Sequence, residues 1–515
     1  MVSRKKASFQ NASVAFITQT IMMIGQFAVQ TVFVHTLGSR YLGANGLFSN
    51  LITFLSFAEL GIGSAFSYAL YKPLADQDHS AIASIMNLFR KVYNAIGMII
   101  LVAGMALSYF VPWFIHNGNK FPHIRLYFIL YLLSTVVSYF FTYNRALLIA
   151  DQKSYIDSFN QFIFNCGRYV LQIVFMIFFN SYIAYLILMI LSNFFSNIAI
   201  TGRSHKRYPY LKTMHQDEVD PVILAKIKHN VVGTISSKVG AIIVTGTDNI
   251  LISKFLGLAL VGIYSNYSLI LTSITRLLNQ VFSSVIASFG NLGVTERENK
   301  KKQLDMFDQF TYYNAFSVFF IGLVSFAFFP PFIKLWLGKS YQLPESTVFF
   351  IVINFVFGQF RPALNMVNAY GLFWGYRVKS IVEAVVNFGL SLALVKFTKM
   401  GIDGVLFGTI IGNILVNSWW DPLILFKGAY HTSMWKFYGK YWLYLSLFGS
   451  LLFIEHLILT AVNISVTSLV PVVAYGLAVG VIVLAALLVL FSRTKGQKGL
   501  FIMAGNIVQR LRHRG

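Results

Sequence analysis

The chain has 515 residues, of which 56% are hydrophobic and 11% are charged, and its formal net charge is +23. Soluble globular proteins carry about 25% charged residues, and a single soluble core stops growing beyond about 250–300 residues. A soluble enzyme, a disordered chain and a disulfide-rich scaffold are therefore excluded, and the composition predicts a protein whose solvent is lipid.

Apolar runs long enough to cross a bilayer, about 20 residues each, follow one another along the whole chain. We count about fourteen, at 12–34, 42–69, 92–115, 125–149, 157–179, 181–201, 230–253, 259–288, 309–333, 345–370, 380–398, 402–420, 441–462 and 467–491. The second and eighth runs are the least apolar, which is typical of helices that face protein or a watery cavity. The sequence thus predicts an all-α, polytopic membrane protein with about 14 transmembrane helices.

The two termini and the loops on one side of the predicted membrane together carry 28 of the 41 Lys and Arg residues. Cytoplasmic loops carry such an excess. We therefore expect a multi-pass plasma-membrane protein with both termini in the cytoplasm. Because the cations lie in short loops between apolar runs, we expect no nucleic-acid partner.

The longest of these loops, 202–229, separates two sets of six runs. We expect an N-terminal six-helix bundle with this loop at 1–229, a second six-helix bundle at 230–440, and two extra helices with a basic tail at 441–515. A weak repeat supports the duplication: GLFSN at 46–50 resembles GIYSN at 262–266, and each follows a Leu-Gly pair. Halves of six helices enter from the same side and are related by an axis along the membrane normal.

One inner segment, 78–91, places four apolar side chains on one face: Ile82, Ile85, Met86 and Phe89. A basic amphipathic helix of this kind lies on an anionic membrane surface. Ordinary anchoring by positive charge on the inner side is the alternative, and the sequence leaves both readings open.

We find no motif in the sequence that is typical of the catalytic sites of soluble enzymes. Gly338-Lys339-Ser340 has the end of a phosphate-binding loop, but the required glycine five residues earlier is Ile333. We find no His/Cys cluster with metal-ligand spacing. We therefore expect no cofactor, no metal and no enzymatic activity.

Charged residues inside the runs are the strongest functional candidates, because a charge at a bilayer centre costs at least about 2.5–3.5 kcal/mol. The cations are Arg145, Arg168, Lys238, Arg276 and Arg361. Carboxylates inside the runs are too few to pair with all of them, which predicts a net positive cavity for an anionic ligand. Phosphate or pyrophosphate is favoured, since arginine binds these groups in a bidentate manner. For Arg145, extension of the side chain to the membrane interface is the alternative.

The carboxylates inside the runs are candidates for ion coupling: Glu59, Asp248 and Glu383. Asp248 also has a local alternative, a cap or a pair with Lys254. Glu383 is one turn from Lys379, with which it can pair. The adjacent pair Glu455-His456 is open to two readings, a proton relay or a packing and interface position.

Two stretches resemble a known family: HTLGSRYLGANGLFSNLITFLSFAELGIGSAFSYALYKPLA at 35–75 and GTDNILISKFLGLALVGIYSNYSLI at 246–270. They are similar to helix pairs of Wzx-type polysaccharide repeat-unit flippases, in the multidrug/oligosaccharidyl-lipid/polysaccharide exporter superfamily. The resemblance implies two six-helix bundles in a V around a central cavity. It also implies transfer of undecaprenyl-pyrophosphate-linked oligosaccharides from the inner to the outer leaflet of the bacterial cell membrane. Many members have twelve helices, whereas the related lipid II flippases have fourteen, with the extra pair flanking a groove for the lipid tail.

The predicted function is therefore a flippase working by alternating access, with lipid-linked oligosaccharide and membrane lipid as partners. A polysaccharide polymerase and glycosyltransferases of the same pathway are further expected partners. The runner-up is a multidrug or cation antiporter of the same superfamily, which would have a cavity of carboxylates and aromatics. A membrane-embedded polysaccharide polymerase is a third alternative, and it would need a catalytic carboxylate or histidine beside a large loop.

Overall fold

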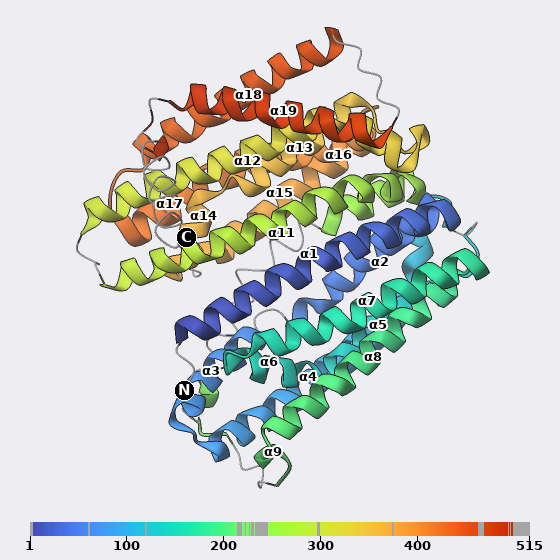
Figure 1. Cartoon of the computed structure of the whole chain (residues 1–515), viewed down its shortest axis with the longest axis vertical. Coiled ribbons are helices and arrows are strands. Elements are labelled where there is room, and N and C mark those ends of the chain that lie inside the picture. Colours follow the sequence, from blue (N-terminus) through green and yellow to red (C-terminus); the bar gives the residue numbers. More distant parts are fainter. Residues whose placement is uncertain are drawn as a thin grey trace, which may run out of the picture. The chain divides into compact units, whose positions relative to one another are not determined.

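The structure is a computed structural model that describes residues 4–59, 62–118, 121–213, 246–295, 299–372, 375–461 and 468–492, with isolated positions between 219 and 231 and at 494, 496 and 497. The regular secondary structure of these residues is helical, with no strand among them (Figure 1). By its internal packing the chain divides into two compact units, residues 1–266 and residues 267–515.

The first unit is built from helices α1 (Arg4–Thr36), α2 (Ser39–Leu55), α3 (Ile62–Asp76), α4 (His79–Phe110), α5 (Ile124–Tyr139), α6 (Thr142–Ala150), α7 (Ser154–Phe179), α8 (Tyr182–Arg207) and α9 (Tyr210–Thr213). Short 3₁₀ turns, η1 (Ser56–Glu59) and η2 (Val111–Phe114), follow α2 and α4. Helix α7 lies between α1 and α8, and α5 packs on α8 and α4.

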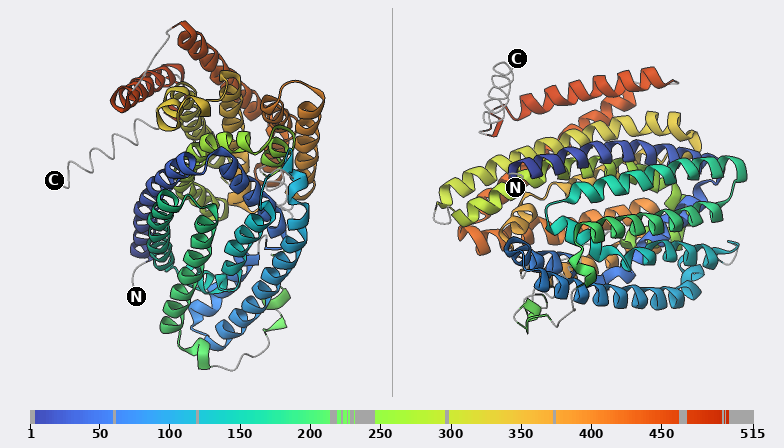
Figure 2. Two further views of the ribbon diagram at one scale, coloured as in Figure 1. Left: turned by 90° about the vertical axis from the view of Figure 1, so that its right-hand side faces the viewer. Right: turned by 60° about the horizontal axis from the view of Figure 1, so that its bottom comes forward.

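The second unit contains most of α11 (Leu258–Thr295), then α12 (Lys300–Leu337), α13 (Glu345–Gln359), α14 (Pro362–Tyr370), α15 (Tyr376–Phe397), α16 (Ile402–Gly412), α17 (Ser418–Leu425), α18 (Trp435–Ala461) and α19 (Leu469–Leu490). A 3₁₀ turn, η4 (Lys339–Tyr341), follows α12, and two π-helical turns, η6 (Asn413–Asn417) and η7 (Phe426–Tyr430), flank α17. Helix α12 packs against α13, α18 and α19, and α15 packs on α16 (Figure 2).

Eleven helices of the described residues are long and apolar enough to cross a membrane, and α5 with α6 forms a twelfth span if this pair, bent by 44°, counts as one. The predicted all-α, polytopic membrane protein is therefore confirmed. Two of the predicted runs have no match among these spans. The run 42–69 is divided into α2, η1 and α3, and the run 230–253 lies mostly outside the described residues.

The outer faces of the spans are apolar, as a lipid solvent requires. Val470, Leu477 and Val489 of α19 are 78%, 68% and 74% exposed within the chain. Apolar surface of this extent is unusual on a soluble monomer. Such a surface fits the hydrocarbon core of a bilayer.

Of the two readings of 78–91, the one in which this segment is a helix on the membrane surface is wrong. This segment is the first part of α4, which runs without a break to Phe110. Its apolar face is buried against α3 and α6, and the ring of Phe89 stacks on Phe66 with the centroids 4.3 Å apart. The amphipathic pattern therefore marks a protein contact and not a membrane surface.

A close backbone contact joins α2 to the start of α11 within the first unit. A Cβ atom on Gly43 would lie 1.8 Å from the carbonyl oxygen of Leu258, and one on Gly262 would lie 2.0 Å from that of Ser39. Each helix follows a glycine with positive φ, Gly38 at 83° and Gly257 at 97°. Only residues without a side chain allow this approach of the two backbones.

The contact also corrects the register of the internal repeat. The sequence match paired Gly46 with Gly262, whereas the structure makes Gly43 and Gly262 the equivalent pair, since each packs on the first residue of the other helix. The Leu-Gly pairs before the two helices agree with this register. The sequence match was displaced by three residues, nearly one helical turn.

Substitution of Gly43 by valine should therefore destabilise the protein. The added side chain overlaps main-chain atoms, which cannot rotate away, so a cost at the upper end of about 1–3 kcal/mol is expected. Thermal unfolding of the purified protein in detergent measures the effect. Gly167→Val on α7 is the matched control, because a Cβ there meets nothing within 4 Å. Equal melting temperatures for both variants would contradict the contact.

Candidate functional site

Arg168 is the intramembrane cation of the first unit that has no ionic partner within the described part of the chain. It lies near the middle of α7 and is half-buried, and its Nε atom is buried without a hydrogen-bond partner. Its guanidinium carbon lies 5.2 Å from the ring centroid of Tyr169. It is also close enough to Tyr131 and Tyr185 to interact with both electrostatically. This charge is therefore available to a ligand.

A group of tyrosines from four helices, α2, α5, α7 and α8, includes the rings next to Arg168. Tyr182 of α8 packs against Tyr41 of α2 and Tyr127 of α5, with ring centroids 4.9 and 5.0 Å apart, and its hydroxyl donates to Asn45 Oδ1 at 2.5 Å. Tyr131 bonds to Ser49. Arg168 with Tyr131, Tyr169, Tyr182 and Tyr185 is called the arginine–tyrosine cluster below. It combines one cation with ring faces and hydroxyls.

Arg145 lies on α6 and is bound to a carboxylate. It forms an ion pair with Asp157 of α7, and its Nη2 atom donates to Ser196 Oγ and Asn197 Oδ1 of α8, each at 2.9 Å. The side chains of Arg145 and Asp157 are 17% and 10% exposed. Arg145 is therefore neutralised by a carboxylate and does not offer a free charge.

Arg361 belongs to a larger, charge-balanced network in the second unit. Its guanidinium donates twice to Asp421 Oδ2, at 2.9 and 2.7 Å, and lies 3.8 Å from Glu383. Lys379 Nζ lies 2.6 Å from Glu383 Oε2 and 3.1 Å from Asp421 Oδ1. Asn417 donates to the other Glu383 oxygen at 2.8 Å. Two cations and two anions cancel, and Lys379 and Asp421 are almost fully buried.

The two networks occupy corresponding places in the two units. In each, a short nine-residue helix after a break, α6 or α14, is held by an arginine to the two following spans. Asn197 and Asn417 contribute from the last of these spans in each unit. The arginines differ in position, since Arg145 lies in the first turn of its helix and Arg361 just before Pro362. What the two units share is therefore an arginine that holds the short helix after a break to the spans that follow it.

The expectation that these cations lack carboxylate partners is wrong for Arg145 and Arg361. In the sequence, Asp157 is the first residue of the run 157–179 and Asp421 directly follows the run 402–420, which predicts both carboxylates at the membrane boundary. Helices α7 and α17 extend beyond those limits and carry both carboxylates inward, where they are buried. The suggested pair of Glu383 with Lys379 is present.

Glu59 is held by two phenols and by no cation in the part of the chain that is described. Tyr139 Oη donates to its Oε2 at 2.6 Å and Tyr93 Oη donates to its Oε1 at 3.3 Å. Tyr139 is also 3.0 Å from Ser56 Oγ. The carboxylate therefore lies among neutral hydrogen-bond donors.

The remaining candidates are separate from these groups. Lys238 lies outside the described residues, and Arg276 is exposed on α11. Asp248 is half-buried in a helical segment at 246–256. Its suggested partner Lys254 donates to the Trp113 carbonyl at 2.5 Å.

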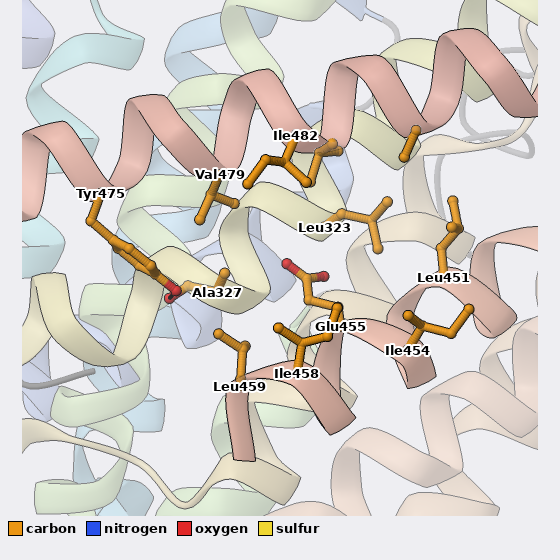
Figure 3. A pocket seen from close by; sticks show the side chains of 12 residues that line it. Leu323, Ala327, Leu451, Ile454, Glu455, Ile458, Leu459, Tyr475, Val479 and Ile482 are labelled. Carbon is orange, nitrogen blue, oxygen red and sulfur yellow. Dashed lines mark hydrogen bonds between the residues drawn. The ribbon is translucent and has the colours of Figure 1, made fainter. Parts of the chain in front are cut away.

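The side chains of Glu455 and His456 have different surroundings. His456 Nδ1 lies 2.6 Å from Glu345 Oε1, and both of these side chains are largely accessible. Glu455 instead borders an apolar cavity of about 260 Å³ between α12, α18 and α19 (Figure 3). The other lining residues are Leu323, Ala327, Leu451, Ile454, Ile458, Leu459, Tyr475, Val479, Ile482, Val483 and Ala486.

No group of three or more metal-ligating side chains lies together among the described residues. The arrangement instead provides a free guanidinium beside tyrosines, two neutralised networks, one carboxylate bound by phenols and one apolar cavity. This combination suits binding and movement of a ligand within a membrane.

Solved structures with the same fold are transporters. A MATE family multidrug resistance transporter of the MOP superfamily, inward-facing, matches with a TM-score of 0.61 and 16% identity over 81% of this chain and 99% of its own. The lipid II flippase MurJ, in an inward closed conformation, matches with a TM-score of 0.63 and 14% identity over 93% and 98%. A MOP superfamily transporter from Pyrococcus furiosus matches with a TM-score of 0.56 and 16% identity over 83% and 97%. No protein-family model and no curated protein sequence matches the chain.

The chain is therefore a multi-pass membrane protein with the fold shared by MATE transporters and MurJ. These neighbours are transporters or flippases and not enzymes. The likeness defines the fold, and the ligand has to be argued from the side chains.

Removal of Asp421 should destabilise the second unit. In Asp421→Ala, Arg361 and Lys379 share Glu383 alone, and an uncompensated buried charge costs about 3–5 kcal/mol. Thermal unfolding in detergent is the measurement. Asp308→Ala, which removes the exposed partner of Lys440, is the control and should cost less than about 1 kcal/mol. Similar decreases of the free energy of unfolding in the two variants would show that burial does not make the Arg361–Asp421 pair more important for stability than an exposed ion pair.

Proposed function

We propose that this protein is a flippase that moves polyprenyl-pyrophosphate-linked oligosaccharides from the inner to the outer leaflet of a bacterial plasma membrane. The observation that carries the proposal is Arg168, a half-buried guanidinium without an ionic partner in the described residues, beside tyrosines. The fold shared with MurJ supports it, as does the resemblance of 35–75 and 246–270 to repeat-unit flippases.

Arg168 would bind the diphosphate of the substrate. Hydrogen bonds between a guanidinium and phosphate oxygens are charge-assisted and form in pairs, and burial strengthens them. The tyrosine rings offer flat apolar faces for sugar rings, and their hydroxyls and Asn45 offer hydrogen bonds. The arginine–tyrosine cluster therefore has groups for both parts of a lipid-linked sugar.

Lys238 and Arg276 are proposed as further contacts to the diphosphate. Arg145 and Arg361 are instead assigned to fixing the broken spans, because carboxylates already neutralise them. Glu383 belongs to the same fixation. Asp248 and Glu59 remain the candidates for ion coupling.

The apolar cavity between α12, α18 and α19 would hold part of the polyprenyl tail. Apart from Glu455 and the Tyr475 hydroxyl its lining is hydrocarbon, and isoprene units bury their surface well against such side chains.

Both termini are proposed to lie in the cytoplasm. Alternating access to the arginine–tyrosine cluster would expose the substrate to each side in turn. An inside-negative potential favours outward movement of negative charge by about 2.3 kcal/mol per charge per 100 mV. Glycosyltransferases would supply the substrate and a polymerase would consume it.

A multidrug or cation antiporter is the second candidate. Neutralisation of Arg145 and Arg361 removes part of the expected positive charge, and Glu59 stands without a cation in the described chain. Resistance to cationic dyes in expressing cells, without movement of lipid-linked sugars, would favour this alternative.

Substitution of Arg168 by alanine should reduce flipping of a fluorescent polyprenyl-pyrophosphate oligosaccharide in proteoliposomes. Loss of hydrogen bonds to a charged group is worth about 1.5–3 kcal/mol, so a decrease of tenfold or more is expected. Arg125→Ala is the control, because Arg125 lies over the ring of Tyr109 outside the cluster. Equal rates for both variants would refute the assignment.

Filling the apolar cavity by Ala486→Phe should weaken transport of the full-length polyprenyl substrate by about tenfold, since each displaced CH₂ group contributes about 0.8 kcal/mol. A short-chain analogue should be transported as by the unmodified protein. Ala478→Phe, on the exposed face of α19, is the matched control. Equal loss for long and short chains would exclude a tail site.

A further inference from the structure

Glu455 is the one carboxylate among the described residues that line the apolar cavity of about 260 Å³ between α12, α18 and α19. It belongs to α18, and its side chain points into the cavity, toward the side chains of α12 and α19 (Figure 3). Apart from this group and the Tyr475 hydroxyl, the lining is hydrocarbon. The cavity therefore combines apolar walls with a single acidic group.

No described residue forms a hydrogen bond or an ion pair with the carboxyl group of Glu455, and its Oε2 atom is buried without a partner. The Tyr475 hydroxyl donates its hydrogen to the Ala327 carbonyl at 3.4 Å and is not a donor to Glu455. The neighbouring His456 is bound to Glu345 at 2.6 Å and does not line the cavity. Because buried polar groups are normally hydrogen-bonded, an unpartnered acid that points into a cavity indicates a ligand.

The cavity is open toward the lipid-facing surface of the second unit. Leu323 and Val483 are buried and form its floor, whereas Ile454, Ile458 and Ile482 are half exposed or more and form its rim. A ligand can therefore enter from the bilayer, in which it has to be soluble.

The size and chemistry of the cavity restrict this ligand. Ligand pockets have volumes of about 300–1,000 Å³, so the cavity is at the lower end of the range and fits a small molecule. A purely hydrocarbon ligand would fill the apolar part and leave Glu455 without a partner. An amine satisfies both parts, since a charge-assisted hydrogen bond from an ammonium to a carboxylate is strong where water is excluded. A carboxylate with an ammonium and a carboxylic acid with a neutral amine give the same ion pair.

We propose that this cavity is a binding site for small lipophilic amines, which reach it from the bilayer. The nitrogen pairs with Glu455, and the apolar body packs against α12 and α19. The site is formed by α12, α18 and α19 alone, so it does not depend on the proposed transport function. Because part of the polyprenyl tail is proposed to occupy the same cavity, a bound amine and the tail would exclude each other.

Binding of tritium-labelled naphthylethylamine to the purified full-length protein in lipid nanodiscs tests the proposal. Naphthylethanol, which has the same apolar body but no amine, is the matched probe, and empty nanodiscs give the amount that only dissolves in lipid. In Glu455→Gln the affinity for the amine should fall by about tenfold or more, because a hydrogen bond between charged groups is lost. The affinity for the alcohol should stay the same.

Two further variants separate the site from general effects. Glu345→Gln is the control, because it removes the accessible carboxylate bound to His456 outside the cavity and should leave binding of the amine unchanged. Ala486→Phe fills the cavity and should abolish specific binding of both probes. Unchanged affinity for the amine in Glu455→Gln overturns the proposal. An equal loss in Glu455→Gln and Glu345→Gln, or specific binding that persists in Ala486→Phe, overturns it as well.

Discussion

The high cost of an uncompensated charge in a bilayer governs the arrangement of polar groups in this protein. Arg145 and Arg361 meet this cost with carboxylates and amides, and their networks carry no net charge. Arg168 has no such compensation in the described chain, where its guanidinium lies over the ring of Tyr169 and its Nε atom has no hydrogen-bond partner. The same residue type therefore has a structural role in two places and a ligand-binding role, as proposed, in the third.

Helix breaks and polar networks occur together in both units, because a break leaves backbone polar groups that need partners within the protein. A broken span exposes backbone groups that lipid cannot satisfy, so the break has to be covered by protein. In the first unit the bend after α5 is flanked by Glu59 on one side and by Arg145 on the other. In the second unit Arg361 precedes Pro362, whose missing N–H allows a helix to start there. Both breaks are thus fixed by ion pairs or charge-assisted hydrogen bonds.

The internal repeat is better conserved in architecture than in residues. The contact of Gly43 with α11 and of Gly262 with α2 has the same form in both directions. The networks on the broken spans use different residues at shifted positions for the same purpose. Two helix backbones can come this close only where both residues are glycine, whereas an arginine can be neutralised by carboxylates on several neighbouring turns. For this reason the glycines are the same in both halves and the charged residues are not.

The sequence by itself determined that the chain is a polytopic membrane protein, and it located twelve of the spans and the charged residues inside them. Apolar runs of this length are stable only in a bilayer or a protein core, so their positions can be read from the sequence. It did not determine which charges are paired, since Asp157 and Asp421 belong to the ends of other helices and only packing brings them to the arginines. Nor did it locate the bend at 140–141, where two phenylalanines stand without proline or glycine, while Pro330 and Pro331 lie inside an unbroken α12. Pairing and bending depend on contacts between distant segments, and these are decided by the tertiary structure alone.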